Sequence, residues 1–296
     1  MNIGFIGFGE AAYNIALGLY GEGVRGIRAT DAMLDHPVRG QQIRARAEEA
    51  HVEMVSSTPE LAAWADVIFA AVPSAFTLDV CAAVKSSLGP GKLYADVSAS
   101  TAKVKEQVWA AIQDTGALFA DAAMLGPLPT YRHKVPILAS GNGAEALRDA
   151  MTPYGMKIDL AGEKPGAASA IKLIRSIYMK GVAALMVEML RTADAYGVTE
   201  EVVSSVAATM DGTPFIPTLN RLVTGTAIHC TRRASELKGS VELVEEAGLD
   251  PEIVLAAKHI HEAFEPYGFA EKNAVSKIKD WTEVIAALRE APEAAR

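Results

Sequence analysis

An apolar run at the start of the chain leads directly into closely spaced glycines. Residues 2–6 read as a short strand, and Gly7, Phe8, Gly9, Glu10, Ala11 and Ala12 follow. In such a pattern the first glycine permits a tight turn, the second lets the backbone approach a pyrophosphate, and the small third residue lets a helix pack close to the strand. The first amides of that helix then face the phosphates. Residues 7–12 therefore predict a binding site for a nicotinamide dinucleotide.

The context of the glycines supports this prediction. An amphipathic helix is expected over 11–20, and Asp31 ends a second short strand at 27–30, about twenty residues after the glycines. A carboxylate there accepts hydrogen bonds from the adenosine ribose and repels a 2′-phosphate, so NAD is favoured. NADP stays possible, because Arg39 or Arg44 could fold back toward a phosphate.

Strand-like and helix-like segments alternate through the first half of the chain. This order is typical of βαβ units, so we expect an α/β fold with a Rossmann-type, doubly wound, mostly parallel sheet. The expected strands are 2–6, 27–30, 52–55, 67–72, 93–97, 118–122, 135–139 and 157–160, and the helices between them are 11–20, 38–50, 77–88 and 101–114.

Gly162 and Pro165 open a different region, which reads as almost wholly helical. We therefore expect a dinucleotide-binding domain over 1–162 and an all-α domain over 163–296. The tail after Ala291 is expected to fray. The expected helices are 166–196, with one apolar stripe along it, then 199–210, 217–223, 230–247, 251–263 and 276–289.

Composition limits the classes of function. The net charge of −8 argues against a nucleic-acid surface, so a small-molecule substrate is the expected partner. Cys81 and Cys230 lie far apart without metal-like spacing, and we expect neither a catalytic thiol nor a metal site. Two thiols in a chain of this size, with no signal peptide and no long apolar run, predict a cytoplasmic protein that does not enter a membrane.

The strongest candidate for chemistry is Lys172 in the long helix, with Arg175 and Ser176 on the same face. A lysine can accept the proton of an alcohol if desolvation and a neighbouring cation lower its pKa toward neutrality. The alternative is an ordinary solvated helix face.

Three motifs together resemble the β-hydroxyacid dehydrogenase superfamily, which includes 3-hydroxyisobutyrate and 6-phosphogluconate dehydrogenases. They are the glycine turn, Gly166 followed by Lys172 on a long helix, and the strand-like segment from Asp121 to Gly126. The chain is most similar to a branch with a 6-phosphogluconate-dehydrogenase-like C-terminal domain. The resemblance implies that Lys172 is catalytic, and that a helical domain completes the site and forms a homodimer.

The chain also departs from that family. The simple hydroxyacid enzymes place Ser-Gly-Gly where this chain has Leu125, Gly126 and Pro127, so a hydroxyl and one N–H donor to a substrate carboxylate are missing. Arg175 and Ser176 stand near the position of a family asparagine. Arg175 could clamp a carboxylate instead, and a structural salt bridge is its rival role.

Two strand ends are expected to line the cleft. Val72 and Pro73 follow the fourth predicted strand and would contact the cofactor, and Ser98 follows the fifth, near cofactor and substrate. A helix N-cap is the alternative role for Ser98.

One further cluster is open to two interpretations. It could bind an anion, but an interhelical salt-bridge face is favoured. The cluster consists of His229, Arg232, Arg233 and Glu236, which share one helical face.

Together these features predict an NAD(P)-dependent oxidoreductase. Hydride would pass between nicotinamide and the carbinol carbon of a β-hydroxy acid or related polar alcohol, with Lys172 as general acid or base. Two alternatives remain open: an imine reductase of the same architecture, and a non-catalytic dinucleotide sensor.

Overall fold

The computed structural model describes residues 1–290 and divides into two compact units, Met1–Ile177 and Tyr178 onward. The expectation of a frayed tail after Ala291 lies outside the described residues. The units meet within one long helix, α8 (Ala167–Ala195). The boundary expected after residue 162 corresponds instead to the loop before that helix, so its first turns lie in the first unit.

The first unit is built on one eight-stranded sheet with the order β3-β2-β1-β4-β5-β6-β7-β8. All pairs are parallel except β6 with β7. This confirms the predicted Rossmann-type fold class. The strands are β1 (Ile3–Ile6), β2 (Ile27–Thr30), β3 (Glu53–Met54), β4 (Val67–Ala70), β5 (Leu93–Asp96), β6 (Leu118–Met124), β7 (Pro136–Ser140) and β8 (Lys157–Leu160).

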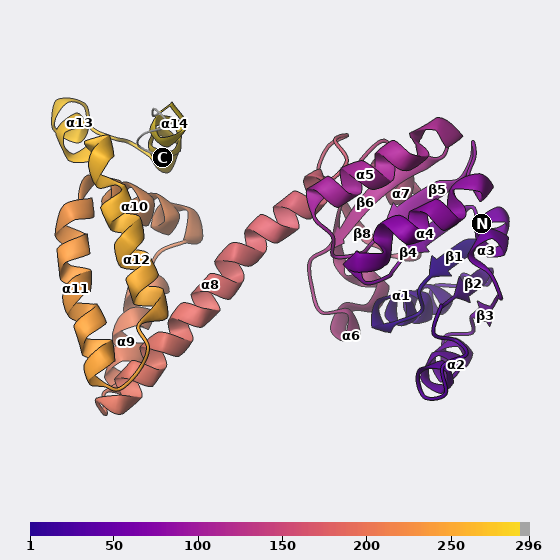
Figure 1. Ribbon diagram of the computed structural model, residues 1–296, viewed down its shortest axis with the longest axis horizontal. Helices are drawn as coiled ribbons and strands as arrows, with labels where there is room; N and C mark the ends of the chain where they lie inside the picture. Colours follow the sequence, from indigo (N-terminus) through magenta and orange to yellow (C-terminus); the bar gives the residue numbers. More distant parts are fainter. Residues whose placement is uncertain (291–296) are drawn as a thin grey trace. The chain divides into compact units, whose positions relative to one another are not determined.

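The central strands are buried on both faces, because helices cover each side of the sheet. One face packs against α1 (Glu10–Gly21), α2 (Arg39–Glu49) and α7 (Ala144–Met151). Helices α3 (Thr58–Trp64), α4 (Thr77–Val84) and α5 (Ala102–Ile112) pack on the other face, where Figure 1 shows α4 and α5 side by side.

Three short helices of this unit were not predicted, α3, α6 (Leu128–Tyr131) and α7, and neither was α13 (Phe269–Val275) in the second unit. The start of α3 could have been predicted from the spacing of Ser57 and Glu60, which is typical of a helix N-terminus. In the structure the Ser57 hydroxyl accepts the Glu60 N–H. Short 3₁₀ turns complete the unit at Ser74–Phe76, Lys85–Ser87, Gln113–Thr115, Arg132–Lys134 and Thr152–Tyr154.

The second unit is helical, as predicted, and α11 and α12 lie side by side in it (Figure 1). The predicted helix at 217–223 is longer in the structure, and the one at 276–289 starts later because residues 276–280 are not helical. Beyond α8 the helices are α9 (Thr199–Met210), α10 (Phe215–Ile228), α11 (Cys230–Glu246), α12 (Glu252–Ala263), α13 (Phe269–Val275) and α14 (Trp281–Glu290), with a 3₁₀ turn at Glu265–Tyr267.

Helix α8 carries an exposed apolar surface in the single chain. Ile174 is 65% exposed and Ile177 is 74% exposed, and Val187 lies more than half exposed further along. Four residues of the stripe read from the sequence, Ile171, Ile174, Tyr178 and Leu185, are exposed, so the rest of the described chain does not cover most of that stripe. None of the helices within residues 1–290 is long and apolar enough to cross a membrane.

Candidate functional site

The glycine turn lies between β1 and α1. Gly7 has a φ of +83°, and a Cβ there would come within 2.6 Å of the Ala71 carbonyl oxygen, so only glycine fits. At Gly9 a Cβ would meet nothing within 4 Å. Gly9 is the N-cap of α1 and supplies no side-chain cap, which leaves the first amides of the helix for a ligand. The turn thus has the open cradle that a pyrophosphate requires.

The other motif residues support this cradle in different ways. Phe8 is buried, with its ring against Phe5, and Ala12 is fully buried against the sheet. Glu10 is exposed and Ala11 is partly exposed at the first turn of α1. Phe8 and Ala12 therefore shape the turn, whereas Glu10 and Ala11 offer backbone amides.

Asp31 is fixed at the end of β2 by two backbone amides. Its Oδ2 accepts the Phe8 N–H at 2.7 Å, and its Oδ1 accepts the Met33 N–H at 2.8 Å. Each oxygen can accept a further hydrogen bond, so the carboxylate can also receive ribose hydroxyls.

Two arginines lie just beyond Asp31 in the chain. Arg44 donates to the Leu34 carbonyl oxygen at 2.8 Å, and Arg39 is exposed at the first residue of α2. Arg44 is thus tied to the loop that follows Asp31.

The turn after β4 adjoins the glycine turn. A Cβ on Gly7 would lie 2.9 Å from Val72 Cγ1, so these two segments touch. Val72 is partly buried and Pro73 is exposed. The structure thus brings Val72, Asp31 and the glycine turn together at the carboxyl edge of the sheet.

Ser98 lies at the same edge after β5, but its side chain is buried. The Ser98 hydroxyl is within hydrogen-bond distance of the Thr77 hydroxyl at 3.0 Å, the Ser100 hydroxyl at 2.8 Å and Lys105 Nζ at 3.2 Å. Helix α5 is capped by Thr101, so Ser98 is not its N-cap. Contact of Ser98 with cofactor or substrate stays a prediction, based on its place in the fold.

The Leu125-Gly126-Pro127 turn follows β6. Leu125 donates its N–H to the Pro136 carbonyl oxygen at 2.8 Å, and Pro127 has no N–H and caps the short helix α6. Gly126 is exposed. Of the three residues of this turn, only Gly126 has a backbone N–H that makes no hydrogen bond to another backbone group among the described residues.

A buried ionic cluster that sequence reasoning missed lies beneath these turns. Lys105, Asp96 and Asp121 have fully buried side chains. Lys105 Nζ lies 2.9 Å from Asp96 Oδ1 and 3.7 Å from Asp121 Oδ1, and it also donates to the Asp96 and Ser98 carbonyl oxygens.

Two signals could have revealed the cluster. Asp96 and Asp121 end or lie in neighbouring predicted strands, and they pair in register in the sheet. Lys105 shares a helix face with Val108 and Ile112, both fully buried. A lysine on that apolar face requires a buried partner.

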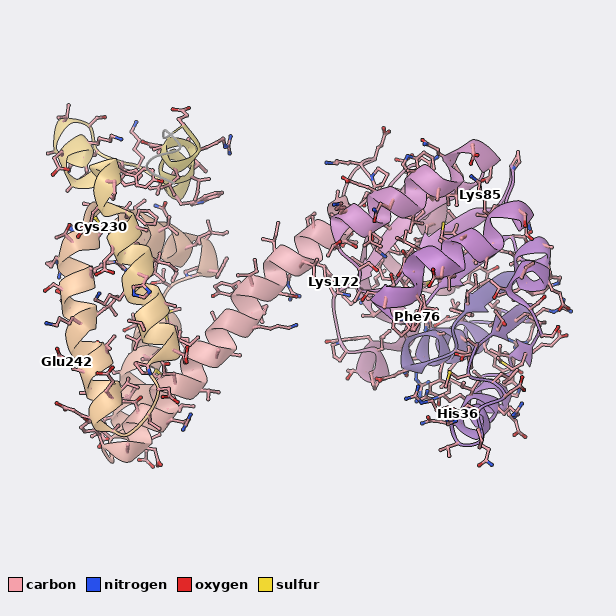
Figure 2. All side chains as sticks on the ribbon, in the orientation of Figure 1. His36, Phe76, Lys85, Lys172, Cys230 and Glu242 are labelled. Carbon is pink, nitrogen blue, oxygen red and sulfur yellow. The ribbon has the colours of Figure 1, made fainter. Side chains whose placement is uncertain are left out.

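Lys172 lies on the first turns of α8, within the first unit. Gly166, just before the helix, has a φ of +86°, and a Cβ there would come within 2.6 Å of the Ala102 carbonyl oxygen, so the chain passes close to α5. Figure 2 labels Lys172 near the start of α8. Lys172 and Ser176 are partly buried, whereas Arg175 is exposed and forms no ion pair among residues 1–290.

The cluster around His229 lies in the second unit. Arg232 pairs with Glu236 one turn later, and Arg233 donates to the Thr226 hydroxyl at 3.3 Å. The ion pair therefore lies within α11, and the contact of Arg233 with α10 is a hydrogen bond, so these contacts do not form the interhelical salt bridges that were expected. Within residues 1–290, no group of three or more His, Cys, Asp or Glu side chains is placed to hold a metal ion.

An apolar cavity of about 490 Å³ also lies in the second unit, between α8, α9, α11 and α12. Its one acidic side chain, Glu188, accepts the Ile253 and Val254 amides at 2.8 Å and so caps α12. The cavity is lined by residues of the second unit, whereas the glycine turn and Lys172 belong to the first unit.

Two family models match parts of the chain. Residues 2–100 match "NADP oxidoreductase coenzyme F420-dependent", and residues 193–264 match a domain of unknown function, DUF1932.

Solved structures extend the match to the whole chain. A conserved hypothetical protein from Sinorhizobium meliloti 1021 is 32% identical, with 97% of this chain and 95% of that chain covered and a TM-score of 0.62. The conserved protein MTH1747, described as structurally similar to 3-hydroxyacid dehydrogenases, is 27% identical over 90% of this chain and 97% of its own, with a TM-score of 0.61.

An imine reductase from Bacillus cereus BAG3X2 shares the fold. It is 17% identical, covers 98% of this chain and 99% of its own, and has a TM-score of 0.73. The glycine turn, the sheet order and the whole-length match to the Sinorhizobium protein together show that this chain belongs to the β-hydroxyacid-dehydrogenase-like superfamily, in a group with an all-α C-terminal domain.

Proposed function

We propose that this protein is an NAD(P)-dependent oxidoreductase that interconverts a polar alcohol, such as a β-hydroxy acid, and the corresponding carbonyl compound. The observation that carries this proposal is the placement of Lys172. Helix α8 is bound at its start to side chains of β6 and β7. Strand β6 lies in the same sheet as β1, which leads into the glycine turn, with β4 and β5 between them. A lysine on that helix is therefore in the same unit as the cradle for the dinucleotide.

The residues present fit a bound dinucleotide. Gly9 leaves space for the pyrophosphate, the first amides of α1 can donate to it, and Asp31 is oriented to accept ribose hydroxyls. The bound nicotinamide would supply the hydride acceptor for alcohol oxidation and the hydride donor for the reverse reaction. We assign NAD as the preferred form because the Asp31 carboxylate would repel a 2′-phosphate. Arg39 and Arg44 are the side chains that would favour NADP.

The protein's part in the chemistry is proton transfer and orientation. In oxidation the neutral amine of Lys172 takes the hydroxyl proton while the carbinol C–H leaves as hydride, and in reduction the ammonium returns that proton to oxygen. Arg175, exposed and without an ion pair among residues 1–290, would bind an acid group of the substrate in bidentate fashion. Gly126 adds one amide, and Ser98 and Ser176 would line the pocket.

Turnover of a substrate panel tests this proposal. Reduced-nicotinamide absorbance would be followed with NAD and NADP across hydroxy acids, phosphorylated and aryl alcohols, and cyclic imines. Lys172→Ala is expected to lower kcat by a factor of about 100 or more while dinucleotide affinity is kept. Lys180→Ala, an exposed lysine two turns later on α8, is the matched control. Dinucleotide binding without turnover of any substrate would favour the sensor.

An imine reductase is the second candidate. The fold it shares with the Bacillus cereus enzyme supports it, as does the loss of donors at Leu125 and Pro127. In this case cyclic imines would be reduced and hydroxy acids would not react.

We also propose that the protein is a homodimer. Ile174, Ile177 and Val187 on α8 expose apolar surface that monomeric proteins seldom leave uncovered, and the core of the second unit is small. A second copy of the chain would cover this surface.

A further inference from the structure

Two side chains from the sheet bind the free amides at the start of α8. Asp121 Oδ2 accepts the Ser169 N–H at 2.9 Å, and Asp121 Oδ1 accepts the Ser169 hydroxyl at 2.7 Å. The Ser140 hydroxyl oxygen accepts the Ala168 N–H at 3.0 Å and donates to Asp121 Oδ2 at 3.3 Å. Amides in the first turn of a helix have no partner inside the helix, so Asp121 and Ser140 act as its cap.

This cap comes from distant parts of the chain because the local sequence supplies none. The residue before α8 is Gly166, and Lys164 and Pro165 precede it, so no short hydroxyl or carboxyl side chain stands at the N-cap position. Asp121 lies 48 residues before Ser169 in the sequence. The start of α8 is therefore fixed to the sheet itself rather than to its own loop.

The capping carboxylate is held in turn by the buried cluster. Asp121 is fully buried, and burial of an unpaired carboxylate is costly. Lys105 lies between Asp121 and Asp96 and provides one positive charge for the two carboxylates. The partial positive charge at the start of α8 compensates the second. The carboxyl end of β5, the middle of β6, the start of α5 and the start of α8 are thereby joined through charged side chains.

Helix geometry links this cap to Lys172. Lys172 follows Ser169 by three residues, so it lies about 4.5 Å further along the axis and about 60° around it. Side chains on a helix lean toward its N-terminus, so the side chain of Lys172 leans back toward the end of α8 that is attached to the sheet.

We propose that Asp121 is a positioning residue: it fixes the first turn of α8 and thereby holds Lys172 in place. This inference rests on the proposed function, in which Lys172 transfers the proton. Asp121 does not touch the substrate. Its loss would let the first turn of α8 open and move the amine away from the reacting hydroxyl.

Amide hydrogen exchange tests the cap without any ligand. Asp121→Asn keeps the shape of the side chain but replaces one acceptor oxygen and the charge, and Ser169→Ala removes one hydrogen bond and leaves the ionic cluster intact. In both variants the amide hydrogens of residues 168–172 are expected to exchange with solvent roughly tenfold faster than in the unmodified chain. Asp159→Asn changes an exposed carboxylate on β8 and is expected to leave this exchange unchanged.

Kinetics test the positioning. In both variants kcat is expected to fall by about tenfold to a hundredfold, with the KM for the dinucleotide within about twofold of the unmodified value. In oxidation, the rise of kcat with pH is expected to shift to higher pH, because water around an exposed Lys172 favours the ammonium form. A solely structural role would lower the amount of folded enzyme and leave this pH profile in place.

The outcomes separate the two proposals. If Asp121→Asn and Ser169→Ala exchange faster at residues 168–172 but keep their kcat and pH profile, the positioning role is overturned. The proposed function still stands in that case, provided that Lys172→Ala is inactive. Full turnover by Lys172→Ala would overturn the proposed function itself, whatever the exchange rates. If Asp121→Asn fails to fold, Ser169→Ala alone decides, and normal kcat with normal exchange in that variant would overturn the inference.

Discussion

The Asp31 carboxylate accepts the Phe8 amide at 2.7 Å, and this bond joins the end of β2 to the middle of the glycine turn. Asp31, the residue expected to select NAD over NADP, is therefore held in place by the turn that would bind the pyrophosphate. Because the Met33 amide binds the other oxygen, the carboxylate cannot rotate away without losing both bonds.

Asp31→Ser is expected to shift the cofactor preference toward NADP by tenfold or more, measured as the ratio of kcat/KM for the two dinucleotides. The reason is that the repulsion of a 2′-phosphate is removed while Arg39 and Arg44 stay. Asp35→Ser, an exposed acid four residues later, serves as the control. A ratio that does not move would assign the selection to other side chains.

Gly9→Ala is expected to weaken dinucleotide binding, whereas Gly7→Ala is expected to lower the stability of the fold. Alanine at Gly9 meets no atom within 4 Å, so thermal stability should hold while the methyl group blocks the dinucleotide and weakens its binding. Alanine at Gly7 meets the Ala71 carbonyl oxygen at a positive φ, so the protein should lose roughly 1–3 kcal/mol of stability. Melting curves and titration with reduced dinucleotide measure both effects, and normal affinity in a folded Gly9→Ala would contradict the cradle.

His133 is expected to make the protein less stable in mild acid. Burial lowers the pKa of His133 below its ordinary value, and Glu22, with an oxygen 3.4 Å from Nε2, opposes this effect. The unfolded chain then binds more protons, so the stabilisation is complete above about pH 6.5 and is lost as the pH falls below it.

Urea denaturation at pH 7.5 and pH 5.5 measures this difference. The unmodified chain should lose more free energy of unfolding between these two values than His133→Gln does, by at most about 1.4 kcal/mol per pH unit. Gly18→Ala is expected to disturb the same contact, since its Cβ would overlap the imidazole. Equal losses in the unmodified chain and His133→Gln would show that other groups cause the pH dependence.

Ile177→Glu is expected to convert the proposed dimer to monomer, because it places a charge on the exposed apolar surface of α8. Val38→Glu is a matched control, since Val38 is 73% exposed and Ile177 is 74% exposed, but Val38 lies outside α8. Light scattering coupled to size-exclusion chromatography gives the mass of each variant. A monomeric unmodified protein would refute the dimer.

Local sequence patterns were sufficient to predict the strands, most helices and the glycine turn. The residues that form the turn from Gly7 to Ala12 are adjacent in the chain, and Asp31 follows at a spacing set by one βαβ unit, so this part of the site could be read directly. The short helices α3, α6, α7 and α13 were missed because few residues carry their periodicity.

The sequence by itself determined the fold class and predicted the dinucleotide cradle, because both follow from residue spacing within one or two elements. Lys172 became the candidate for proton transfer through the resemblance to the β-hydroxyacid dehydrogenases. Only the tertiary structure showed that Lys105, Asp96 and Asp121 form one buried cluster, and that Asp121 caps α8. Periodicity indicates which side chains face inward, but partners from separate strands and helices meet only when the sheet and its helices pack together.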